Sequence, residues 1–95
     1  MTDFAKKLFE RTGIQEYDSC EAVVTETVYN GCFAHVTGPK NTVRSFVYGG
    51  FCVGDILLVT VRINDAKKRL YCKVDSVISF ATDKEEKCFA FEYAA

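Results

Sequence analysis

Long apolar stretches are missing from this 95-residue sequence, in which no run comes close to the roughly 20 residues that a transmembrane helix needs. The N-terminal stretch MTDFAKKLFERTG also lacks the apolar segment that follows the basic start of a secretory signal peptide. We therefore expect no membrane association and a cytoplasmic location. The length fits one small domain, and a hydrophobic share of 48% is ordinary for a globular protein.

Histidine is scarce and the cysteines are widely spaced. His35 is the only histidine, and no two cysteines have the C-x-x-C spacing of a zinc site. In a reducing compartment we expect small, buried side chains at all five cysteines, which are Cys20, Cys32, Cys52, Cys72 and Cys88. The sequence also lacks a glycine-rich phosphate loop with its lysine and a recognisable pair of carboxylates. We therefore expect no metal, no cofactor and no enzymatic activity.

The net charge is only −1, but the charge is distributed unevenly along the chain. Residues 10–26 carry five acidic side chains against one arginine, and residues 74–95 carry five against two lysines. Between them, residues 40–73 carry seven lysines and arginines against two aspartates. Five of these cations fall in the stretch RINDAKKRLYCKV at 62–74. Such a local basic segment says more about an anionic partner than the total charge does.

Hydrophobic periodicity predicts a short helix followed by β-structure. Apolar side chains recur at helical spacing in residues 3–12, and Gly13 is well placed to end that helix. A helix this short must dock on the rest of the fold. Alternating patterns predict strands at 20–28, 31–36, 42–48, 55–63 and 69–80, separated by turns such as GPKN and NDAK. Residues 87–94 form either a sixth strand or a tail, so the fold class is all-β, a small antiparallel barrel or sandwich.

Strand alternation also assigns side chains to opposite faces of the sheet. One face is expected to carry Cys20, Ala22, Val24, Cys32, Ala34, Val36, Val43, Ser45, Val47, Leu57, Val59, Val61, Ile63, Leu70, Cys72, Val74 and Ile78. The outer face of the second and third strands then carries Phe33, His35, Arg44, Phe46 and Tyr48. Aromatic rings interleaved with cations on an exposed sheet form a platform on which nucleic-acid bases stack. The alternative is that the helix or the C-terminal tail covers Phe46 and Tyr48.

Two segments, VYNGCFAHV at 28–36 and VGDILLVTVRINDAKKRLYCKV at 53–74, resemble the S1 RNA-binding domain family. The shared elements are a Gly-x-Phe-Val-like stretch at 31–34, a Val-Gly-Asp start at 53–55, and Asp65 followed by Arg69 and Leu70. The resemblance covers about residues 18–78. It implies a five-stranded antiparallel OB-fold barrel at 18–80, preceded by the helix and lead-in at 1–17 and followed by a turn and strand or tail at 81–95.

The resemblance also implies a role for individual residues. Phe33 would stack a base, while Asp65 and Arg69 would flank the nucleic acid from the loop between the fourth and fifth strands. Asn30 stands where the family often has an aromatic residue, and Arg44 and Ser45 stand where it commonly has a histidine. Sequence preference is therefore not carried over from the family.

Together these features predict a module that binds single-stranded RNA with little sequence specificity. The expected phosphate contacts are Arg44, Lys67, Lys68, Arg69 and Lys73, which would make binding dependent on salt. The alternative is a protein-interaction barrel that docks on the ribosome or on an RNA-processing protein. The acidic segments at both ends of the chain would repel nucleic acid or compete for the basic face. The features that favour this alternative are the missing family histidine and the short link YGGFC at 48–52, where the family has a longer, partly helical connection.

Overall fold

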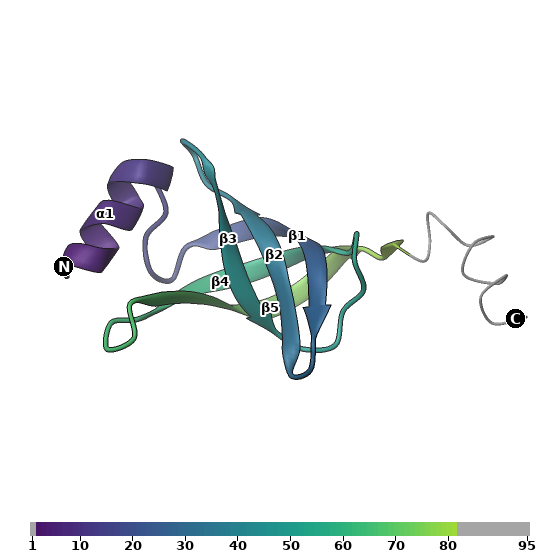
Figure 1. The fold of residues 1–95 in the computed structure, drawn as a ribbon. Coiled ribbons are helices and arrows are strands. Elements are labelled where there is room, and N and C mark those ends of the chain that lie inside the picture. Colours follow the sequence, from purple (N-terminus) through teal and green to yellow (C-terminus); the bar gives the residue numbers. More distant parts are fainter. Residues whose placement is uncertain (1, 82–95) are drawn as a thin grey trace, which may run out of the picture.

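The structure is a computed structural model that describes residues 2–81. One helix precedes five strands along the chain (Figure 1). These elements are α1 (Asp3–Thr12), β1 (Ser19–Val28), β2 (Gly31–Thr37), β3 (Thr42–Tyr48), β4 (Ile56–Asn64) and β5 (Arg69–Ser79). They confirm the helix and the five strands that the periodicity predicts. The sixth strand or tail expected at 87–94 lies outside the described residues.

The five strands form a closed barrel in the order β1-β2-β3-β5-β4. This confirms the expected all-β fold, a five-stranded barrel of OB-like architecture with a short N-terminal helix. Four of the five neighbouring pairs are antiparallel, whereas β3 and β5 run parallel and pair Phe46 with Tyr71 and Val47 with Cys72. The parallel pair follows from the closure itself, since an odd number of strands in a ring cannot alternate in direction at every contact.

Alternating side chains fill the barrel interior with small and β-branched residues. The buried strand residues are Cys20, Ala22, Val24, Cys32, Ala34, Val36, Ser45, Val47, Leu57, Val59, Val61, Leu70 and Cys72. Ile78 was expected inside but is 53% exposed, and Val77 packs against the core instead. The reason is a register shift in the β4–β5 pairing between Leu58 and Val59, because an extra residue in β5 exchanges its inner and outer faces.

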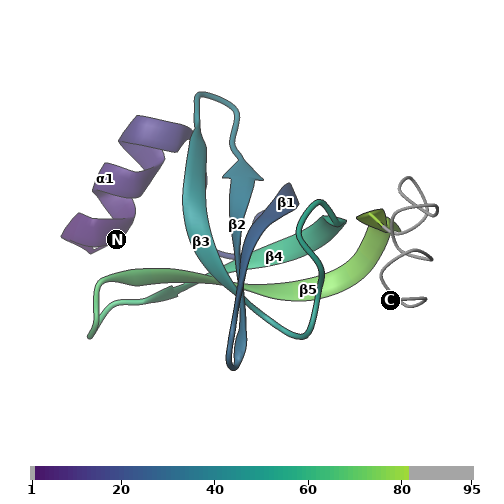
Figure 2. The same ribbon diagram turned by 45° about the vertical axis from the view of Figure 1, so that its right-hand side comes forward.

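Helix α1 lies across one end of the barrel, between the β2–β3 turn and the β4–β5 loop (Figure 2). Thr2 caps its start by accepting a hydrogen bond from the Ala5 N–H, and Gly13 ends it with a left-handed φ of 79°. Leu8 on the helix and Ile14 just after it are buried in the barrel core. This confirms that the short helix is held by docking rather than by its own propensity.

The Val-Gly-Asp stretch at 53–55 ties three segments together at the entrance to β4. The buried carboxylate of Asp55 accepts hydrogen bonds from the Cys52 N–H at 2.9 Å and from the Ala81 N–H at 2.7 Å. Its backbone carbonyl accepts from Val24 N–H in β1 at 3.0 Å. Asp55 therefore holds the chain after β5 against the β3–β4 connection, which is a structural role.

Candidate nucleic-acid interface

Four aromatic side chains form a continuous row on the outside of the barrel, which we call the aromatic row. The ring centroids of Phe33 and Phe46 lie 5.6 Å apart, those of Phe46 and Tyr48 lie 4.9 Å apart, and those of Tyr48 and Tyr71 lie 5.8 Å apart. Each pair meets edge to face, the arrangement that aromatic rings prefer. The row crosses β2, β3 and β5 because Phe33 pairs with Phe46, and Phe46 with Tyr71.

Phe33, Phe46 and Tyr48 stand on the outer face, where the alternation of the sequence puts them. Within residues 2–81, the Tyr48 side chain is 58% exposed, so α1 does not cover it. Tyr71 was not among the expected site residues. Alternation places its side chain outside, but only the parallel pairing of β3 and β5 brings it next to Tyr48.

An open hollow of about 450 Å³ lies beside the aromatic row and is lined by all four of its rings. The end of β4 brings Asn64 to this hollow, the β4–β5 loop brings Lys67, and the start of β5 brings Arg69. The β1–β2 turn brings Asn30. Among residues 2–81, no acidic side chain lines it. Aromatic rings beside two cations suit the two parts of a nucleotide, an apolar base that stacks and an anionic phosphate.

Arg44 is already engaged in this structure. Its Nη2 donates a hydrogen bond to Glu26 Oε2 at 2.7 Å, and its guanidinium carbon lies 4.0 Å from the centre of the Phe33 ring. The two charged side chains are 54% and 56% exposed, so this ion pair is a weak one in water. A base that stacks on that face of Phe33 must therefore displace Arg44 or stack over it.

The other expected site residues are spread around the aromatic row rather than gathered in it. Arg69 and Lys67 line the hollow, whereas Lys68 points to the groove beside α1. Lys73 is exposed on β5 opposite Thr60, and His35 is exposed on β2 opposite Arg44. Neither Lys73 nor His35 lines the hollow.

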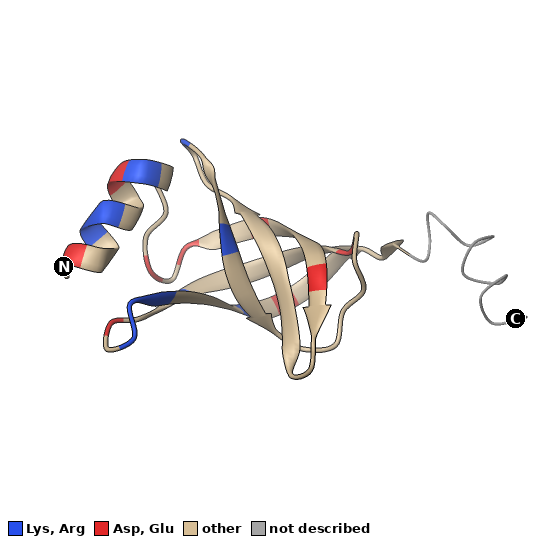
Figure 3. Ribbon diagram, viewed as in Figure 1, with Lys and Arg blue, Asp and Glu red and all other residues tan. Residues whose placement is uncertain are grey.

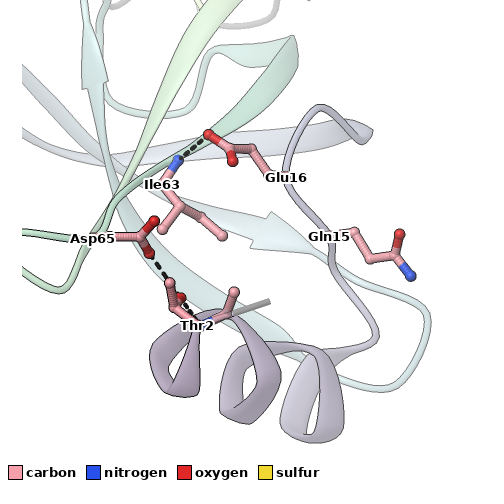
Figure 4. Close-up of a pocket in the computed structure, with 6 residues that line it drawn as sticks. Thr2, Gln15, Glu16, Ile63 and Asp65 are labelled. Carbon is pink, nitrogen blue, oxygen red and sulfur yellow. Dashed lines mark hydrogen bonds between the residues drawn. The ribbon is translucent and has the colours of Figure 1, made fainter.

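Asp65 lies on the other side of the β4–β5 loop from the aromatic row. Its carboxylate accepts a hydrogen bond from the Thr2 hydroxyl at 2.8 Å, next to the start of α1 (Figure 4). It lines a second hollow together with Glu16, whose carboxylate accepts from the Ile63 N–H at 3.1 Å. The loop thus separates an acidic hollow from the hollow that Lys67 and Arg69 line.

Figure 3 shows lysines and arginines on α1, on β3 and along the β4–β5 loop, with acidic residues on α1 and in the loop as well. Arg62, the first cation of the basic stretch, is directed elsewhere. Its guanidinium stacks 4.7 Å from the centre of the Tyr17 ring, and its Nε lies 3.6 Å from Glu16 Oε2. Arg62 therefore belongs to the side of the barrel that carries the acidic hollow.

Thiol chemistry finds little support in the described residues. Cys20, Cys32 and Cys72 are buried, as expected, while Cys52 is exposed, contrary to expectation, and Cys88 lies outside the described residues. Burial raises the pKa of the Cys72 thiol to about 11, although the hydrogen bond with Ser45 partly opposes this shift. A thiol with so high a pKa is protonated at neutral pH and is a poor nucleophile.

Profiles of known protein families and curated proteins give no significant match to this chain. Among residues 2–81, no three histidine, cysteine or acidic side chains lie close enough to hold a metal ion. No helix in that range is long and apolar enough to cross a membrane.

Proposed function

We propose that this protein binds single-stranded RNA with little sequence specificity through the aromatic row and the cations beside it. The observation that carries the proposal is the continuous row of four rings next to Lys67 and Arg69, in a hollow to which the described residues contribute no acidic side chain. The OB-like barrel and the resemblance to S1 RNA-binding domains support the same ligand class.

Binding would divide between stacking and charge. Every base has a flat π-face, so stacking on exposed rings is tolerant of sequence and contributes about 1–3 kcal/mol per base. Lys67 and Arg69 would neutralise phosphates, and the release of counterions makes that part of the affinity fall with salt. Few cations line the hollow, so the stacking part should persist at high salt.

The test is a fluorescence-anisotropy titration of a labelled single-stranded RNA at several salt concentrations. Tyr48→Leu keeps apolar bulk but removes an exposed ring, and it should weaken binding about 5- to 150-fold at every salt concentration, given 1–3 kcal/mol per stacked base. Tyr17→Leu is the matched control, because Tyr17 is 65% exposed but stacks on Arg62 on another side of the barrel. Arg69→Gln should flatten the salt dependence.

Two results decide between this function and its alternative. A loss with Tyr48→Leu and none with Tyr17→Leu supports RNA binding at the aromatic row. If the wild-type protein binds no RNA at low salt, or if both variants bind as it does, the proposal is wrong. The protein-interaction module would then be the better reading of the barrel.

A further inference from the structure

Helix α1 and strand β3 form the two sides of a groove of about 420 Å³. Phe4, Lys7, Leu8 and Arg11 recur three and four residues apart, so they share the helix face that is turned towards this groove. Arg44 from β3 and Lys68 from the β4–β5 loop line it as well. Of the part of the chain that the structure describes, four cations and no acidic side chain line this groove.

This groove continues the surface of the aromatic row. Arg44 and Leu70 line both the groove and a smaller hollow of about 380 Å³. That smaller hollow shares Phe33, Phe46 and Arg69 with the hollow over the aromatic row. An uninterrupted path thus runs from the β1–β2 turn over the aromatic row, past Arg69 and Arg44, to α1.

We propose that α1 extends the RNA-binding surface, with Lys7, Arg11 and Lys68 contacting the phosphates of nucleotides that lie beyond the aromatic row. This inference rests on the proposed function, because the aromatic row must hold the first nucleotides. Charge complementarity supports an RNA backbone as the occupant, because all the charged residues along the described lining of the groove are cations: Lys7, Arg11, Arg44 and Lys68. The hollow on the opposite side of the β4–β5 loop carries Glu16 and Asp65 and would repel the strand.

The extended path also gives Arg44 a second role. Arg44 stands where the groove meets the smaller hollow, and its exposed ion pair with Glu26 is weak enough for a phosphate to replace the carboxylate. A strand that follows the path would therefore pass from stacking contacts to contacts made through phosphates alone. Short RNA ligands would occupy the aromatic row alone, whereas longer ones would occupy both the aromatic row and the groove beside α1.

The test compares two double variants of equal net charge. Lys7→Gln with Arg11→Gln removes two cations that line the groove, while Lys6→Gln with Lys40→Gln removes two exposed cations that do not. Each is titrated with a labelled RNA of about 4 nucleotides, the low end of OB-fold site sizes, and with one of about 12. Thermal unfolding checks that all the proteins are folded.

With the longer RNA, the groove variant should bind more weakly than the wild type. Its slope of log K against log salt should be shallower by about 1.4, since each phosphate contact on a single strand contributes about 0.7. The control variant should keep the wild-type slope. With the shorter RNA, both variants should bind as the wild type does.

Other outcomes overturn the inference. Equal effects of both double variants would mean that only overall charge matters, and no effect of the groove variant would mean that RNA does not reach α1. Poly-glutamate binding that depends on Lys7 and Arg11, without such dependence for RNA, would assign the groove to an acidic polypeptide. Failure of the proposed function is distinct, because then Tyr48→Leu has no effect with either length of RNA.

Discussion

Replacing Glu26 with glutamine should strengthen RNA binding, because the change releases Arg44 from its ion pair. In the free protein the Arg44 guanidinium donates to the Glu26 carboxylate at 2.7 Å and covers one face of Phe33. Glutamine has nearly the same size and still accepts a hydrogen bond, but it carries no charge. The fold should change little, since an exposed ion pair contributes about 0–1 kcal/mol to stability.

The expected gain in RNA affinity can be estimated from the solvent exposure of the Arg44–Glu26 ion pair. Both side chains are about half in solvent, so a phosphate that takes Arg44 from Glu26 loses about 0.2–1 kcal/mol of attraction. Removing that competition should lower the Kd about 1.4- to 5-fold. If Arg44 then neutralises one further phosphate, the slope of log K against log salt becomes steeper by about 0.7.

The measurement is an anisotropy titration of labelled single-stranded RNA across a salt series. Glu21→Gln is the control, since it removes the same charge from β1 but pairs with Leu58 of β4, away from Arg44. The control should leave the slope unchanged, and adding Arg44→Gln to Glu26→Gln should abolish the gain. Weaker binding by Glu26→Gln, or a gain that Glu21→Gln reproduces, would refute the reasoning.

Two predictions concern the barrel itself. Asp55→Asn should lower the free energy of unfolding by about 1–3 kcal/mol, because one of the two backbone N–H donors then faces an amide NH₂ instead of a carboxylate oxygen. A denaturant titration measures this loss. An unchanged midpoint would argue against the Asp55 contacts. Burial raises the pKa of the Cys72 thiol from 9.0 to about 11, so the folded state keeps this proton to higher pH than the unfolded chain. The stabilisation is complete below about pH 9 and is lost as the pH rises towards 11. Cys72→Ala should make this decline smaller without abolishing it, because burial also raises the pKa values of Cys20 and Cys32. Chemical denaturation across this pH range measures the difference.

Strand positions and faces could be predicted because local alternation controls them. Cys32, Ala34 and Val36 are buried as expected, since a strand with one apolar side has a single favourable orientation. Ile78 was placed wrongly because a register shift depends on the partner strand, and β4 determines it here. No sequence pattern predicts the exposure of Cys52 either, because that exposure follows from the path of the β3–β4 connection.

The candidate site could be predicted only where single strands define it. Phe33 and Phe46 follow from alternation within β2 and β3, but Tyr71 joins them through the parallel pairing of β3 and β5, which no local pattern encodes. The β4–β5 loop is a second example. Its neighbouring side chains Asp65 and Lys67 line different hollows, and Lys68 has a positive φ of 52°. Spacing along the chain does not reveal which side of such a turn a charge occupies.

The parallel pairing of β3 and β5 gives the outer surface a polarity. Outward positions on β3 read Arg44, Phe46, Tyr48 in chain order, and those on β5 read Arg69, Tyr71, Lys73. Because the strands run the same way, Arg44 and Arg69 stand at one end, and Tyr48 and Lys73 stand at the other. An antiparallel pair would have mixed the two ends. Under the proposed function, a strand of RNA lying along this surface would therefore meet different chemistry in its two orientations.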